Sequence, residues 1–346
     1  MMKSLKKLLK RYKVDGYIIP KNDEYFNEYV HTSKDRLKFV SGFSGSAGFA
    51  IILKNKNFLF VDGRYTIQAK KQSGEDFKII EIHKFLPYKI IRNLKLGFDP
   101  KLFTERQLKI YFNSLSILKP ITHNLVDQIC KKKKLKNKPF FVLNKKITGE
   151  SHVSKIKKIV KKIISFNAEY IFISAPENVA WLLNIRGYDN PNSPIPNCRL
   201  IISKKKKIFL FADKNKVSKI IKSKNFKNCI VVQPNKFEKF INNLRGKNFI
   251  IDSQTCSMEN QRIIQSKFKI ISKNDPCYLF KAVKNSTEIK NMINTHIEDG
   301  AALTKFIYWI KNKNKKKITE IDAEKKLEKF RRINRNYLFP SFNTIA

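Results

Sequence analysis

The sequence predicts an α/β protein with two tandem α/β domains, followed by the opening helices of an incomplete third unit. Short apolar runs of strand length alternate with amphipathic helical patterns over the first 276 residues. The alternation restarts after a Lys- and Asn-rich segment, residues 131–138, which ends at Pro139 and resembles a linker. After Pro276 the pattern becomes helical. We therefore expect domains at residues 1–137 and 138–276 and an unfinished unit at 277–346.

The first domain is predicted to open with a helix within residues 1–14, because Leu5, Leu8, Leu9 and Tyr12 recur at helical spacing. Two strands should form a hairpin across the polar turn 54–56. The strands are expected at residues 16–19, 47–53, 57–61, 77–82 and 94–98, and further helices at 65–72 and 104–115.

A glycine-rich segment, residues 41–48, superficially resembles a phosphate cradle or a nucleophile elbow. Both would need a helix directly afterwards, whereas the pattern that follows is a strand. We predict a tight loop in which Gly42, Gly45 and Gly48 allow positive φ or close backbone packing.

The second domain repeats the alternation of strands and helices. Helices are expected at residues 151–163 and 176–183, and strands at 170–173, 200–202, 208–211, 230–232 and 249–252. The helix that carries Trp181 on its buried face should end with Gly187 as its left-handed residue. Arg186 would then lie in its last turn, beside the negative end of the helix dipole.

The C-terminal segment is predicted to contain two helices. Asn285 and Glu288 form a capping box before a long apolar stripe, and Thr319 with Asp322 caps a second helix that reaches about residue 333. The stripe would lack its partner sheet, so we expect an exposed apolar patch and better solubility for a chain that ends near Pro276.

The formal charge of +44 raises the possibility of a nucleic-acid partner. Only 12 of the 72 basic residues are Arg, the residue that reads bases and phosphates bidentately, and the Lys runs fall at linkers or turns. We therefore expect a solvated surface and no nucleic-acid binding. No uncharged apolar stretch of about 18 residues occurs, so no membrane span is predicted.

The usual signatures of a metal centre are absent from the sequence. The five Cys residues are widely spaced and form no Cys-x-x-Cys pair, which suits a reducing, cytoplasmic environment. The five His residues, at positions 31, 83, 123, 152 and 296, have no carboxylate neighbour at metal-ligand spacing. No catalytic or metal-ligating residue is assigned.

The segment Val61-Asp62-Gly63-Arg64-Tyr65 is a candidate binding site, because it follows a strand and opens a helix. Arg64 could grip a carboxylate or peptide carbonyl bidentately. Alternatively, Arg64 pairs with Asp62 and only stabilises the turn.

Several segments together resemble the Xaa-Pro aminopeptidases of the creatinase/prolidase group. They are Tyr17-Ile18-Ile19-Pro20, Asn27-Glu28-Tyr29, residues 39–48, Val61-Asp62-Gly63-Arg64-Tyr65, Gly97-Phe98-Asp99-Pro100, Asn124-Leu125-Val126-Asp127, residues 180–187 and Lys281-Ala282-Val283-Lys284-Asn285. Each segment is short, but as an ordered set they cover nearly the whole chain.

This resemblance implies two creatinase-like domains before a "pita-bread" catalytic domain that holds two metal ions, usually manganese. A metal-bridging water would there attack the bond before a penultimate proline. The family's metal ligands would lie beyond Ala346, and residues 338–342 resemble the first strand of that domain. We therefore expect an inactive N-terminal part of a cytoplasmic enzyme that acts on peptides with a penultimate proline and is a homodimer when complete.

Two substrate-binding residues follow from the resemblance. Arg64 matches the Arg of the family's Asp-Gly-Arg-Tyr motif, which reaches the peptide at the mouth of the active site. Glu28 matches a Glu suited to hold the substrate's N-terminal ammonium, although Asn27 replaces the usual Ser; its alternative is a carboxylate on a helix surface.

Two other functions stay open at this point. A non-enzymatic relative could use the paired domains only for binding, and a prolidase-type dipeptidase belongs to the same group. An open reading frame with His, Asp and Glu ligands after codon 346 would favour an enzyme.

Overall fold

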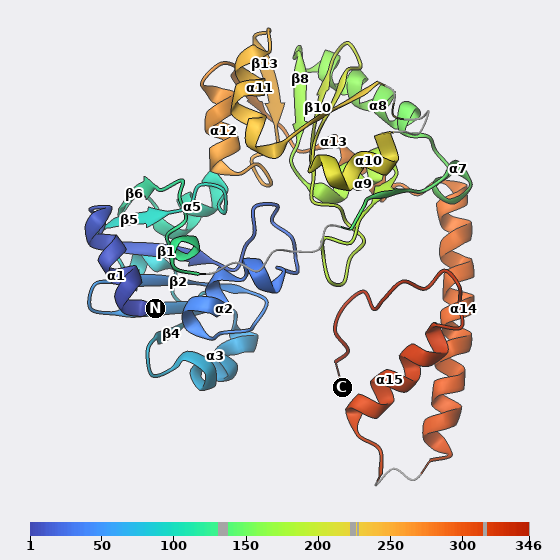
Figure 1. Ribbon diagram of the computed structural model, residues 1–346, viewed down its shortest axis with the longest axis horizontal. Coiled ribbons are helices and arrows are strands. Elements are labelled where there is room, and N and C mark those ends of the chain that lie inside the picture. Colours follow the sequence, from blue (N-terminus) through green and yellow to red (C-terminus); the bar gives the residue numbers. More distant parts are fainter. Residues whose placement is uncertain (131–137, 222–225, 227, 314–316, 346) are drawn as a thin grey trace.

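A computed structural model of the chain describes residues 1–130, 138–221, 226, 228–313 and 317–345. It contains two α/β units, which meet near α5 and α12, and a pair of helices that projects from the second unit (Figure 1). The predicted linker at residues 131–138 and the Lys run at 131–134 lie, apart from Lys138, outside the described residues. So does most of the Lys run at 315–317.

The first unit is a six-stranded sheet with helices on both faces (Figure 1). Its elements are α1 (Met2–Arg11), β1 (Gly16–Pro20), α2 (Arg36–Ser41), β2 (Gly48–Leu53), β3 (Asn57–Val61), α3 (Thr66–Ser73), β4 (Lys78–Glu81), α4 (Pro87–Ile90), β5 (Lys95–Phe98), α5 (Glu105–Phe112), β6 (Ile117–Pro120) and α6 (Leu125–Ile129). The central strand β1 is buried on both faces because its residues alternate: Tyr17 and Ile19 belong to one core cluster and Ile18 to the other.

The second unit is also built on a six-stranded sheet. Its elements are β7 (Phe141–Val142), α7 (Lys145–Thr148), α8 (His152–Ser165), β8 (Tyr170–Ile173), α9 (Pro176–Leu183), β9 (Ile185–Arg186), β10 (Arg199–Ser203), β11 (Ile208–Phe211), α10 (Lys214–Ile221), β12 (Cys229–Val232), α11 (Phe237–Asn243), β13 (Asn248–Ile251), α12 (Met258–Gln265), β14 (Lys269–Ser272) and α13 (Pro276–Ala282).

The two sheets have the same topology. The strand order is β4-β3-β2-β1-β5-β6 in the first and β12-β11-β10-β8-β13-β14 in the second. In both, the first three strands of the sheet in chain order pair antiparallel, and the three remaining pairings are parallel. The prediction of two α/β units is confirmed, and the shared order reveals a repeat in the fold that residue-level comparison does not detect.

The units meet through backbone and side-chain contacts. The N–H of Met258 donates to the carbonyl of Phe103 at 2.8 Å, and the N–H of Glu259 donates to the carbonyl of Pro100 at 3.0 Å. The Met258 side chain packs against the core of the first unit. The guanidinium of Arg199 lies 4.6 Å from the ring centre of Tyr25. These contacts join the segment before α5 to the start of α12 and hold the loop after β1 against the second unit.

α9 spans the predicted range, residues 176–183, but the left-handed residue that follows it differs from the prediction. The helix ends at Leu183, and Asn184 is the left-handed residue (φ 54°), so Gly187 is not its C-terminal glycine. Asn is one of the few residues other than Gly that adopt this conformation, and the side chain of Asn184 donates to the carbonyl of Glu150, 34 positions earlier in the chain. Arg186 lies in β9, after the helix, although its Nη1 still donates to the carbonyl of Ala180.

Two C-terminal helices, α14 (Ser286–Lys311) and α15 (Glu320–Arg331), follow the second unit. Both predicted capping boxes are present. The side chain of Asn285 donates to the carbonyl of Thr148, and Arg331 pairs with Asp299 at 2.7 Å. The predicted apolar stripe is exposed: Ile289, Met292, Ile293 and Ile297 are all about half exposed or more.

Residues 338–342 do not form the predicted strand. A strand gains its stability from hydrogen bonds to a neighbouring strand, and among the described residues no strand pairs with this segment. Pro340 also lacks the N–H that such pairing would need. Within the described part of the chain, no helix combines the length and the apolar character needed to cross a membrane.

Candidate functional site

The glycine-rich segment forms the tight loop that the sequence predicts, between α2 and β2. Gly42 has φ 76° and ends α2, and Gly48 has φ 152° at the start of β2. A Cβ on Gly45 would lie 2.2 Å from the ring of Phe43. The loop thereby carries Ser46 to the turn after β3, where its hydroxyl bonds that of Tyr65 at 2.7 Å.

The turn after β3 is built around Asp62. Its Oδ1 accepts both the backbone N–H of Arg64 at 3.0 Å and the Nε of the same residue at 2.8 Å. These bonds from Arg64 lower the pKa of Asp62 to about 2, so its carboxylate is ionised at neutral pH. The alternative interpretation of Arg64, pairing with Asp62, is thus present in the structure.

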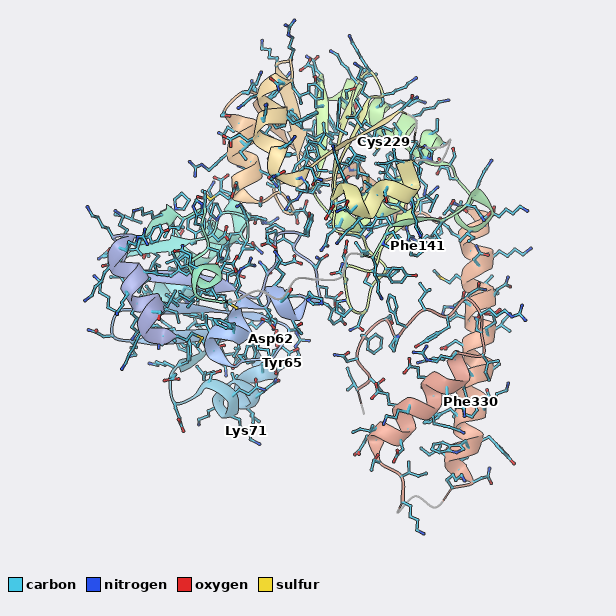
Figure 2. The ribbon with its side chains drawn as sticks, in the orientation of Figure 1. Asp62, Tyr65, Lys71, Phe141, Cys229 and Phe330 are labelled. Atoms are coloured by element: carbon cyan, nitrogen blue, oxygen red, sulfur yellow. The ribbon has the colours of Figure 1, made fainter. Side chains whose placement is uncertain are left out.

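The pairing still leaves Arg64 open to a ligand. Its side chain is 70% exposed, and its guanidinium lies 5.3 Å from the ring centre of Tyr65. Neither terminal nitrogen of Arg64 has a hydrogen-bond partner among the described residues. Asp62 and Tyr65 lie at the edge of the first unit that is nearer the C-terminal helices in the view of Figure 2. A guanidinium that is fixed at Nε and has free terminal nitrogens is suited to bind a carbonyl or carboxylate.

Glu28 lies at a bend in the loop between β1 and α2, outside the short 3-10 helix Thr32–Lys34 of that loop. Its alternative as a helix-surface carboxylate is therefore wrong. The buried Asp23 organises the loop by accepting the backbone N–H groups of Tyr25 and Asn27. Asn27 in turn donates to Asn197 of the second unit at 2.9 Å. Glu28 itself is exposed, and its carboxylate has no partner in the described part of the chain.

A buried arginine anchors this loop to the first unit. Arg36 pairs with Glu24 at 2.6 Å and makes a bidentate contact with Asp127, with both nitrogen–oxygen distances at 2.9 Å. Burial by itself would raise the pKa of Glu24, but Arg36 and Lys34 outweigh it and lower that pKa to about 2. The ion pair therefore holds the segment that presents Glu28.

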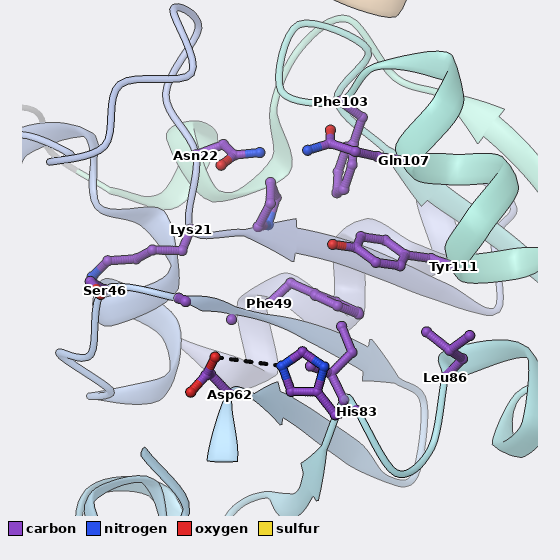
Figure 3. Close-up of a pocket in the computed structure, with 14 residues that line it drawn as sticks. Lys21, Asn22, Ser46, Phe49, Asp62, His83, Leu86, Phe103, Gln107 and Tyr111 are labelled. Atoms are coloured by element: carbon purple, nitrogen blue, oxygen red, sulfur yellow. Dashed lines mark ion pairs between the residues drawn. The ribbon is translucent and has the colours of Figure 1, made fainter. Parts of the chain in front are cut away.

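The structure brings Arg64 and Glu28 to the same unit but not into contact with each other. It also adds a residue that sequence reasoning missed. The Nε2 of His83, which follows β4, lies 3.6 Å from Oδ2 of Asp62 (Figure 3). The parallel pairing of β3 with β4 brings the ends of both strands together, and this pairing was the only signal that could have linked the two residues.

A cavity of about 590 Å³ opens beside this turn, at the carboxyl ends of β1 and β3 (Figure 3). Ligands in open α/β sheets bind at this edge, and the volume is typical of small-ligand pockets. The wall includes Asp62 and His83 from the strand ends and Gln107 and Tyr111 from α5.

The described residues do not fit a metal ion. No group of three or more His, Cys, Asp or Glu side chains within them could hold one. We therefore assign no metal ligand to this chain and derive no chemical step through a metal.

Comparison with known proteins identifies the two units. Residues 1–129 match the Creatinase/Prolidase N-terminal domain, and residues 131–288 match a second domain of the same description. The chain is 30% identical to Xaa-Pro aminopeptidase 1 of Dictyostelium discoideum, over 100% of this chain and 59% of that protein. It is 28% identical to aminopeptidase P2 of Arabidopsis thaliana, over 96% of this chain and 54% of that protein.

A solved structure resembles almost the whole chain. X-prolyl aminopeptidase from Caenorhabditis elegans, described as a cytosolic enzyme with a di-nuclear active site, superposes with a TM-score of 0.86 at 25% identity. The match covers 99% of this chain and 61% of that one. The chain thus spans between 54% and 61% of the length of these three relatives.

Proposed function

We propose that this chain, which its two N-terminal domains make a member of the creatinase/prolidase family, forms the N-terminal part of an Xaa-Pro aminopeptidase. The observation that carries this proposal is the superposition of 99% of the chain on the C. elegans enzyme. The function is the release of an N-terminal residue that precedes proline in a peptide.

Arg64 is proposed to bind the peptide substrate. Its Nε is held by Asp62 at 2.8 Å, while the side chain is 70% exposed. A guanidinium fixed at one nitrogen loses less conformational entropy when its other nitrogens bind a carbonyl or carboxylate. The turn therefore prepares Arg64 for binding.

Glu28 is proposed to hold the N-terminal ammonium of the substrate. Its carboxylate is exposed and free of partners among the described residues, and its loop is fixed at both sides by Asp23 and Arg36. An ammonium near such a carboxylate would be favoured by charge and by hydrogen bonding. Substrate peptides would then bind between the first unit and the residues that carry the chemistry.

The chemistry itself is proposed to lie in a pita-bread domain with two manganese ions, of which residues 277–346 supply only the opening helices. This is consistent with the di-nuclear site of the C. elegans enzyme and with the missing metal cluster in the described part of this chain. The domains would be residues 1–137 and 138–276. We further propose that the complete enzyme is a cytoplasmic homodimer.

Neither alternative function is favoured. A purely binding protein and a prolidase-type dipeptidase would both be compatible with creatinase-like domains. The curated relatives that match nearly the whole chain, however, are named Xaa-Pro aminopeptidases. The proposed function involves neither a nucleic acid nor a membrane.

A hydrolysis assay tests the proposal that this chain alone is inactive. The 346-residue chain is incubated with Mn²⁺ and the tripeptide Ala-Pro-Ala, and free alanine is measured. We expect no release above the buffer control, because the described residues hold no metal cluster. Robust turnover that a chelator abolishes would contradict the proposed division of roles.

A further inference from the structure

We propose that the cavity at the strand ends of the first unit binds proline-containing peptide segments, at a site whose wall includes Asp62 but neither Arg64 nor Glu28. The choice of ligand class rests partly on the proposed function and partly on the chemistry of the wall. The polar groups of the wall can form hydrogen bonds and carry no unpaired charge, and its apolar groups suit the compact ring of proline.

The charges near the cavity are already compensated. Asp62 is paired with Arg64, and Lys21, whose stem lines the wall, is paired with Asp35 at 2.6 Å. A strongly anionic or cationic ligand would therefore find no unpaired partner of opposite charge in these residues. A neutral ligand such as the interior of a peptide fits better, since burying an uncompensated charge is costly.

The cavity presents hydrogen-bond donors. Oε1 of Gln107 accepts the N–H of Thr104 in a capping box, which fixes the amide and directs its Nε2 away from the helix end. Neither this Nε2 nor the hydroxyl of Tyr111 has a partner among the described residues. Figure 3 shows the Gln107 nitrogen pointing toward Asn22 and the Tyr111 hydroxyl pointing into the cavity. Carbonyl oxygens of a ligand could accept from both groups.

The apolar part of the wall is aromatic and aliphatic. The ring of Tyr111 stacks on Phe49 with centres 5.0 Å apart, and Phe103 and Leu86 line the cavity beside them. Grooves lined by aromatic rings are a common way to bind proline-rich segments. Proline also lacks an N–H, so a proline peptide brings carbonyl acceptors with fewer donors to satisfy. The free donors of Gln107 and Tyr111 suit such a ligand.

The helix that follows the fourth strand differs between the two units, despite their matching topology. The helix that follows its fourth strand is α11, and Phe237 at its start is buried against Phe211, with ring centres 5.0 Å apart. In the first unit the corresponding helix is α4, a single turn, and the side chains before it are the half-buried Leu86 and the exposed His83. The strand ends of the first unit are therefore bordered by a one-turn helix, whereas the second unit has a longer helix that starts with a buried aromatic residue.

The test uses capped peptides, which have no free N-terminus and so cannot be aminopeptidase substrates. Binding of acetyl-Ala-Pro-Ala-amide and acetyl-Ala-Ala-Ala-amide to the 346-residue chain is measured by ligand-observed saturation-transfer NMR. We expect the proline peptide to bind about five-fold more tightly, because the alanine peptide would bury one N–H without a hydrogen-bond partner. Equal affinities, or no detectable binding up to the solubility limit, would overturn the proposal.

Matched variants locate the site. Tyr111→Phe removes only the hydroxyl, and Gln107→Glu keeps the capping-box acceptor while removing the amide donors. Each should weaken binding of the proline peptide by about five-fold or more. The controls Tyr12→Phe and Gln128→Glu make the same chemical changes at α1 and α6, where the two side chains bond each other, and should leave the affinity unchanged. Equal effects in both pairs would overturn the assignment to this cavity.

The outcomes also separate this site from the proposed function. Loss of capped-peptide binding has no bearing on hydrolysis by the complete enzyme, and cavity-dependent binding would persist even if the chain had no enzymatic role. Circular dichroism melting of each variant checks that a change in affinity does not come from unfolding.

Discussion

Asp62 receives two hydrogen bonds from Arg64 on one carboxylate oxygen, from the backbone N–H at 3.0 Å and from Nε at 2.8 Å. The sequence left two interpretations open, a turn-stabilising pair or a substrate-binding arginine. The geometry makes them compatible, because the pair uses only Nε and leaves the terminal nitrogens without a partner among the described residues. Asp62 would then act as the support of a substrate-binding group.

Two arginines that both contact carboxylates should differ sharply in their effect on stability. Arg64→Ala should leave the free energy of unfolding almost unchanged, because the pair is exposed. Arg36→Ala should cost about 3–5 kcal/mol, because it leaves Glu24 and Asp127 facing each other without their buried cation. Urea unfolding measures both values, and similar losses in the two variants would refute the assignment of Arg36 as the anchor.

The Glu24–Arg36 pair should make stability depend on acid pH. The pKa of Glu24 is lowered to about 2 in the folded chain from an ordinary value of 4.5. Its contribution is therefore fully present above pH 4.5 and is lost as the pH falls toward 2, by up to about 3 kcal/mol. Unfolding free energies of the parent and of Glu24→Gln are compared between pH 6 and 3. The gap between the two curves should shrink as the pH falls; parallel curves would count against this pair.

A glycine pair tests the backbone of the loop near Arg64. Gly48 has φ 152°, and a Cβ there would lie 2.7 Å from the carbonyl oxygen of Phe60. Gly48→Ala should thus destabilise the chain by about 2 kcal/mol or more. Gly300 lies inside α14, where an added Cβ would meet no atom within 4 Å, so Gly300→Ala should stabilise by about 0.5–1 kcal/mol. Thermal melting measures the stability of both variants. A Gly48→Ala variant as stable as the parent would contradict the tight packing of this loop.

The exposed stripe on α14 should reduce solubility. Ile293 and Ile297 are 56% and 66% exposed. Because Cys277 and Phe280 belong to the core of the second unit, the shortened chain should end at Lys284 and not at Pro276. We expect both this chain and the double variant Ile293→Glu, Ile297→Glu to remain monomeric at concentrations where the full chain associates. Light scattering measures the association, and identical behaviour of all three would disprove the role of the stripe.

Local patterns in the sequence predict much of the fold. The β2–β3 hairpin, the capping boxes at Asn285 and Thr319 and the glycine loop depend on neighbouring residues, and all are present. Prediction fails where distant residues decide. β6 and β14 were missed because edge strands are short and carry Lys and Pro among their apolar residues.

In the candidate site, too, features set by neighbouring residues can be predicted and contacts between distant residues cannot. Arg64 and its turn can be predicted from a short motif, whereas His83 reaches Asp62 only because β3 and β4 pair. The contact of Arg36 with Asp127 joins α2 to α6 across the unit, and no periodicity indicates it. The range of α9 was predicted correctly, but its left-handed end residue was not, because Asn184 and not Gly187 takes that position.

A fusion enzyme tests the central claim most directly. Residues 1–346 are joined to the part of the C. elegans X-prolyl aminopeptidase that lies beyond the structural match, and hydrolysis of Ala-Pro-Ala is measured with Mn²⁺. We predict turnover by the fusion, and a loss of about 100-fold in kcat/KM for Arg64→Ala, as for a charge-assisted hydrogen bond to substrate. An Arg64→Ala fusion as active as its parent would contradict the claim that this chain binds the substrate through Arg64.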